Sequence, residues 1–169
     1  MSPLRALRCL LFACCALGFV PGAHAGDKYR VQVVPYVEPQ PPGPDETLIY
    51  VVREKSGFGA AQKLAIIDND TVVGVLMPGT FTYFKVPSGQ HEIVGYFSPS
   101  PMVHYRVLPS PGKTVYLHVK VGYTTGLFMT PIEAQEAMML MSGYKFTDIG
   151  IKNQKAKMNY KDYYDRLFQ

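Results

Sequence analysis

Residues 63–94 decide the fold and read KLAIIDNDTVVGVLMPGTFTYFKVPSGQHEIV. Four short apolar runs are separated by three turn signals, Asp68-Asn69-Asp70, Pro78-Gly79 and Pro87-Ser88-Gly89. Short runs rich in Val, Ile, Phe and Tyr that are bounded by such signals are typical of β-strands joined by tight turns. The stretch therefore predicts an antiparallel meander of four strands.

Further strands are expected on both sides of this stretch. Residues 47–53 (TLIYVVR) are apolar on both alternations, which is typical of a central strand covered on both faces. Residues 29–36 predict a short edge strand, because Pro35 lacks the N–H that a central strand needs. Residues 114–121 alternate, with Val115, Leu117, Val119 and Val121 toward a core and Tyr116, His118 and Lys120 toward solvent.

Two helices are expected near the C-terminus. Residues 130–133 (TPIE) form a capping box, and Gly143 suits the end of a helix that begins there. A second helix is predicted from apolar side chains at helical spacing, namely Tyr160, Tyr163, Tyr164, Leu167 and Phe168. This stripe either docks on the domain or contacts a partner. The predicted fold class is mainly β: a small antiparallel β-sandwich with one or two C-terminal helices.

The N-terminus has the pattern of a secretory signal peptide. Arg5 and Arg8 precede an apolar run over residues 9–20, and residues 23–25 (AHA) predict cleavage between Ala25 and Gly26. The alternative is a lipoprotein acylated at Cys14, and membrane association is expected only in that case. We therefore predict an exported, periplasmic protein. All of its cysteines lie in this leader, so the mature chain has no thiol for a disulfide or a zinc site.

The chain divides by composition into four parts. We expect a signal peptide over residues 1–25, a proline-rich spacer over 26–46, a β-sandwich domain with a capping helix over 47–143, and a C-terminal tail with an amphipathic aromatic helix over 144–169. Without Arg5 and Arg8, 15 basic and 13 acidic side chains remain, a net charge of +2. So weak an excess does not indicate a nucleic-acid partner.

The mature chain contains no motif that identifies an enzyme or a cofactor. Gly57 and Gly59 do not belong to a phosphate-binding pattern, and the acidic turn at Asp68 lacks the later positions of a calcium loop. An alternative is a metal-dependent hydrolase, in which His104 and His118 share a sheet face with Glu92 or Asp68 as a further ligand. His91 is the remaining histidine of the mature chain. Histidines on the wet face of a sheet are far commoner than metal ligands, so we predict no enzyme, no cofactor and no metal.

Residues 47–121 resemble the bacterial domain of unknown function numbered family 2846. The matching pieces are turn-flanked β runs in a fixed order, namely residues 49–53, 56–57, 64–68, 73–76, 79–86, 87–91 and 111–117. The PSGQH turn at 87–91 also resembles the surface β modules called PEGA domains. The resemblance implies an exported, often lipid-anchored β-sandwich of the cell envelope, and it supplies no catalytic residues.

These observations favour a non-enzymatic envelope module that binds or braces a protein or a cell-wall polymer. Two alternatives remain open beside it. One is the metal-dependent periplasmic hydrolase that uses surface histidines. The other is an accessory subunit of a secretion or surface apparatus, in which Tyr160, Tyr163, Tyr164, Leu167 and Phe168 make the contact.

Overall fold

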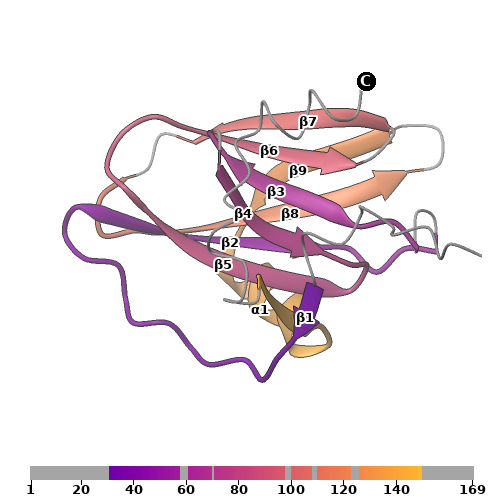
Figure 1. Ribbon diagram of the computed structural model, residues 1–169. Helices are drawn as coiled ribbons and strands as arrows, with labels where there is room; N and C mark the ends of the chain where they lie inside the picture. Colours follow the sequence, from indigo (N-terminus) through magenta and orange to yellow (C-terminus); the bar gives the residue numbers. More distant parts are fainter. Residues whose placement is uncertain are drawn as a thin grey trace, which may run out of the picture.

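The computed structural model describes residues 31–57, 61–69, 71–97, 100–107, 110–122 and 126–149. It consists of strands with one short helix (Figure 1). In chain order the elements are β1 (Val31–Val33), β2 (Glu46–Arg53), β3 (Leu64–Asp68), β4 (Thr71–Leu76), β5 (Thr80–Pro87), β6 (His91–Phe97), β7 (Ser100–Val107), β8 (Thr114–Gly122), β9 (Gly126–Ile132), α1 (Ala134–Ser142) and β10 (Lys145–Ile149).

The strands form two sheets that face one another. The larger has the order β1-β10-β5-β2-β8-β9, and the smaller has the order β4-β3-β6-β7 (Figure 1). The smaller sheet is wholly antiparallel, whereas β2 runs parallel to β8 and β10 runs parallel to β5 in the larger one. The prediction of a mainly β protein is confirmed, and the predicted antiparallel sandwich needs correction in the larger sheet, which is mixed.

The predicted four-strand meander is only partly formed. β3 and β4 make the expected hairpin, and Asn69 at its turn adopts a left-handed conformation with φ 50°. The next turn, through Gly79 with φ 69°, sends the chain out of that sheet. β5 consequently pairs with β2 in the larger sheet, and β6 returns to pair with β3. A turn signal marks where a strand ends, but it does not specify which sheet the next strand joins.

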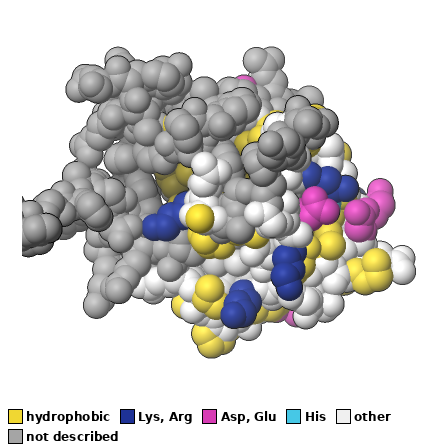
Figure 2. Space-filling model, turned by 90° about the vertical axis from the view of Figure 1, so that its right-hand side faces the viewer, with side chains coloured by type: hydrophobic (Ala, Val, Ile, Leu, Met, Phe, Trp, Pro, Cys, Tyr) yellow, Lys and Arg dark blue, Asp and Glu magenta, His cyan; other side chains and the backbone are white. Residues whose placement is uncertain are grey.

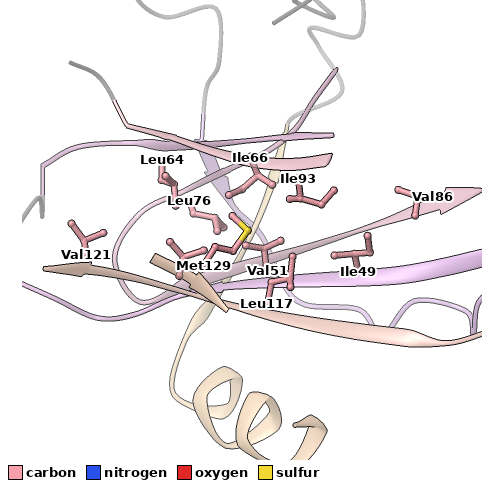
Figure 3. Close-up of a cluster of buried hydrophobic side chains, with 11 residues drawn as sticks. Ile49, Val51, Leu64, Ile66, Leu76, Val86, Ile93, Leu117, Val121 and Met129 are labelled. Atoms are coloured by element: carbon pink, nitrogen blue, oxygen red, sulfur yellow. The ribbon is translucent and has the colours of Figure 1, made fainter. Parts of the chain in front are cut away.

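The core lies between the two sheets. Buried aliphatic side chains from β2, β5, β8 and β9 meet those of β3, β4 and β6, and several are drawn in Figure 3. Met129 lies near the middle of this layer, among Ile66, Leu76 and Val51. The predicted inward face of residues 114–121 is confirmed, because Leu117, Val119 and Val121 all belong to this core.

The two outer faces differ in chemistry. The smaller sheet carries a second buried cluster, which consists of Ala65, Ile67, Val72, Val75, Val94 and Tyr96. The larger sheet carries an aromatic cluster beneath α1, in which Tyr50, Phe81 and Val52 are buried. In Figure 1 the segment between β1 and β2 passes on the same side of the larger sheet as α1. The larger sheet therefore has described chain on both of its faces.

Helix α1 begins later than predicted. Residues 130–132 still belong to β9, where Thr130 pairs with His118 and Pro131 with Leu117, and the helix N-cap is Glu133 without a side-chain capping bond. β9 is an edge strand, so Pro131 can occupy it without costing the sheet a hydrogen bond. The predicted helix end is confirmed, because the Gly143 N–H donates to the Leu140 carbonyl. No helix in the described chain is long and apolar enough to cross a membrane.

Candidate functional site

Three tyrosines form a row on the outer face of the larger sheet. The antiparallel register pairs Tyr50 with Tyr83, and the parallel register pairs Tyr50 with Tyr116. Side chains of directly paired residues point to the same face of a sheet. The ring centroids of Tyr50 and Tyr116 are 5.1 Å apart with nearly parallel planes, and those of Tyr50 and Tyr83 are 5.6 Å apart.

Tyr36 adds a fourth tyrosine from the proline-rich segment. Its hydroxyl and that of Tyr50 share a hydrogen bond of 3.0 Å, and its ring meets Phe81 and Phe146 edge to face. The Tyr83 hydroxyl donates to the Val37 carbonyl at 3.4 Å, which adds a second attachment. Residues 36–37 therefore lie on the sheet through specific contacts.

A pocket opens between this aromatic row and helix α1. Its volume is about 310 Å³, and its lining combines rings with thioethers: Tyr36, Glu38, Tyr50, Phe81, Tyr116, Met138, Met141 and Ser142. Tyr50 and Phe81 are almost completely buried at its floor, whereas Tyr36 is 44% and Met138 58% exposed at its rim. A concave, mostly apolar site with a few polar groups is the usual form of a binding pocket.

Glu38 is the one charged residue in this lining. Burial is the main cause that raises the pKa of Tyr50 and of Tyr116, and the negative charge of Glu38 adds to the rise at both rings. The Glu38 carboxylate therefore lies close enough to influence the pocket floor. Both tyrosines stay neutral over the whole physiological pH range.

His118 lies under helix α1, beside the pocket. It is 3% exposed, so the predicted outward position on a wet face is wrong. Among the described residues, none places a donor or acceptor within hydrogen-bond distance of either ring nitrogen. Burial is the main cause that lowers the pKa of His118; Lys120 lowers it further, and Glu54 and Glu136 oppose the change.

His91 is buried too, but in a polar turn at the end of the smaller sheet. Its Nδ1 lies 2.7 Å from the Asp68 carboxylate and its Nε2 lies 3.1 Å from the Pro87 carbonyl oxygen. Asn69 completes the turn, because its side-chain oxygen accepts from the Glu92 N–H. The acidic turn therefore serves hairpin formation, as its sequence predicted, and ties β3 to the start of β6.

Arg53 fixes one end of β2 inside the protein. Its Nη1 donates to the carbonyl oxygens of Gln62 and Leu76, each at 2.8 Å, and burial lowers the pKa of its guanidinium to about 10. Arg53 thereby links the larger sheet to the end of β4 and to the connection before β3. This arrangement braces the fold and leaves the guanidinium remote from solvent.

The structure separates the histidines of the metal-hydrolase hypothesis. The strand of His104, β7, pairs with β6 in the smaller sheet, whereas His118 belongs to the larger one. The metal-site hypothesis required these two strands to pair with each other, and they do not. The chain passes from the smaller sheet to the larger one between β7 and β8, where the sequence pattern indicated a hairpin. Within the described ranges, no three potential metal ligands gather.

Several predicted positions lie outside the described residues. These are the partner-contact candidates Tyr160, Tyr163, Tyr164, Leu167 and Phe168, the cleavage site at Ala25 and Gly26, and Cys14. Sequence reasoning also missed the pocket. The alternation that placed Tyr116 and His118 on one face was a usable signal, but nothing local indicated that Tyr36 and Glu38 would meet that face.

Comparison with known proteins gives no further guide to the site. No family model, no curated protein and no solved structure matches the chain. The resemblance to family 2846 therefore stays a prediction, and any function must be argued from the geometry of the pocket itself.

Proposed function

We propose that the protein is an exported, non-enzymatic module of the cell envelope that binds a partner protein through the pocket between β2, β8 and α1. The observation that carries the proposal is a concave aromatic site on the outer face of a braced sheet. Export rests on the signal-peptide pattern of residues 1–25.

The rim of the pocket supports a protein as the partner. Val37 is 70% exposed and Met138 is 58% exposed, and both lie beside Tyr36 or the pocket lining. Flexible methionine side chains adapt to the shape of a partner surface, and aromatic pockets accept the anchor residues that dominate binding energy. A free small molecule would fill the pocket without covering this rim.

The electrostatics of the surface are compatible with a modest, specific contact. Figure 2 shows hydrophobic side chains in separate patches between basic and acidic ones on one side of the molecule. Charges of both signs are interspersed there, so long-range attraction to a strongly charged polymer is not favoured. The metal-hydrolase alternative is not carried forward, because its two histidine strands are not neighbours.

Site-specific photocrosslinking of the full chain in its native envelope tests the proposal. A photoreactive residue replaces Met138 at the pocket rim or, as a matched control, exposed Thr71 at the far sheet. We expect a discrete crosslinked protein from position 138 that is lost when Tyr36 is changed to alanine. Equal crosslinking from both positions would overturn the proposal, and a crosslinked glycan would replace the protein partner by a cell-wall polymer.

A further inference from the structure

Among the described residues, the negative charge of Glu38 in the pocket lining is not balanced by a nearby cation. Lys85, on β5 of the same sheet, donates from Nζ to the carboxylate of Glu46 and to the Pro41 carbonyl, each at 3.1 Å. The Gly43 N–H and then Lys85 lower the pKa of Glu46, so this carboxylate and this ammonium group neutralise one another. In the described part of the chain, no lysine or arginine forms an ion pair with Glu38.

The pocket thus presents one carboxylate beside several aromatic rings. The face of an aromatic ring attracts a cation, and the hydroxyl oxygens of tyrosine add partial negative charge. Tyr36, Tyr50 and Tyr116 all line the same space as Glu38. An apolar anchor side chain such as leucine would gain no binding energy from the negative electrostatic potential of this pocket.

We infer that the pocket binds an arginine side chain of the partner protein, with the guanidinium group between the tyrosine rings and the Glu38 carboxylate. The inference rests on the proposed function, because it assigns the anchor residue of that same site. The methylene stem of the arginine packs against Met138 and Met141. Its planar guanidinium stacks on aromatic rings and pairs with a carboxylate better than the compact, strongly hydrated lysine ammonium does.

Methyl NMR of methionine in the purified mature protein tests the inference directly. Met138 and Met141 report on the pocket, and the core residue Met129 serves as an internal reference. The probe is N-acetyl-arginine methylamide, compared with the uncharged citrulline analogue and with the lysine analogue. We expect saturable shifts of the two pocket methyl groups with arginine, weaker shifts with lysine and none with citrulline.

Substitutions in the pocket lining test which side chains contribute to the free energy of arginine binding. Glu38→Gln and Tyr116→Leu should each weaken arginine binding by about five-fold or more. Glu133→Gln serves as the matched control, since Glu133 is an exposed carboxylate outside the pocket lining and should leave binding unchanged. An unchanged NMR spectrum away from the pocket shows that each variant is folded.

Each remaining outcome contradicts the inference in a recognisable way. Equal shifts with arginine and citrulline would show that charge is irrelevant, and stronger shifts with the lysine analogue would assign a different anchor. Absence of any shift, together with partner crosslinking from position 138, would overturn the arginine anchor and leave the proposed function standing. Absence of both would overturn the two together.

Discussion

Two histidines are buried to almost the same extent in very different surroundings. His91 is 7% exposed at the turn of the smaller sheet, and both of its ring nitrogens face an acceptor. His118 is 3% exposed beneath helix α1, and within the described structure neither of its nitrogens has a hydrogen-bond partner. The two side chains share residue type and burial but differ in hydrogen bonding. Both ring nitrogens of His91 have a partner, and neither ring nitrogen of His118 has one among the described residues.

This contrast shows that burial alone does not determine what a polar side chain contributes to the free energy of unfolding. A buried polar group lowers the free energy of unfolding unless hydrogen bonds replace those it made with water. His91 recovers these bonds from the Asp68 carboxylate and the Pro87 carbonyl oxygen. His118 recovers none from the described residues, so we expect it to be a local weakness of the larger sheet.

The largest effect is expected from His91→Leu. This change removes two hydrogen bonds and leaves the mostly buried Asp68 carboxylate without its donor, so the free energy of unfolding should fall by about 2–3 kcal/mol. Urea denaturation of the mature protein measures the change. The same substitution at His118 is the matched control, and an equal or smaller loss at position 91 would contradict the contrast.

An opposite sign is expected from His118→Leu. Leucine fills a similar volume beneath α1 and requires no hydrogen bond, so the free energy of unfolding should rise by about 1 kcal/mol. The measurement is again urea denaturation. The midpoint should rise, and the dependence of the free energy of unfolding on urea concentration should stay unchanged. A loss of stability instead would mean that the imidazole has a partner which the hydrogen-bond pattern of the described residues does not reveal.

A smaller, pH-dependent effect separates the two histidines further. Burial, and then Lys120, lowers the folded-state pKa of His118 below its ordinary value of 6.5, although Glu54 and Glu136 partly oppose this. The unfolded state then binds the proton first, so protonation favours unfolding as the pH falls below 6.5. Well above that pH the ring is neutral in both states, so its ionisation no longer changes the free energy of unfolding.

The free energy of unfolding should therefore fall more steeply with decreasing pH in the unmodified protein than in the His118→Leu variant. Urea denaturation at a series of pH values between 7 and 5 gives both curves. Parallel curves would show that the folded-state pKa of His118 is not lowered.

The smallest effect is expected from Asn69→Gly at the His91 turn. Asn69 adopts φ 50°, a conformation that glycine reaches without strain, but the change removes the bond to the Glu92 N–H. These contributions oppose one another, so the free energy of unfolding should change by less than about 0.5 kcal/mol. A loss comparable with that of His91→Leu would show that the turn depends on Asn69 as much as on the histidine.

The sequence predicted local structure well and the assembly of strands less well. Alternation located the core side chains of β8, such as Leu117 and Val119, because the period of a strand is a local property. The parallel pairing of β2 with β8 joins segments that are far apart in the chain, and no turn signal encodes it. The wrong pairing assumed for His104 and His118 has the same origin.

The candidate site could not be predicted from the sequence, for a related reason. Tyr50 and Tyr116 are directly paired only because of that parallel register, and Tyr36 reaches them from a segment with the composition of a spacer. Their chemistry was present in the sequence, but their proximity depends on tertiary structure. A single apolar outer face covered by α1 also explains why His118 is buried where alternation predicted solvent.

The insertion of β10 has a consequence for the order in which the protein is completed. β10 lies between β1 and β5, so the first described strand joins its sheet only through the last one. Pairing between such distant segments is slow to form because a long loop must close first. During synthesis β1 therefore stays unpaired in this sheet until β10 has been made, and the pairing of β10 with both β1 and β5 then joins the first and the last described strand to the sheet in one step.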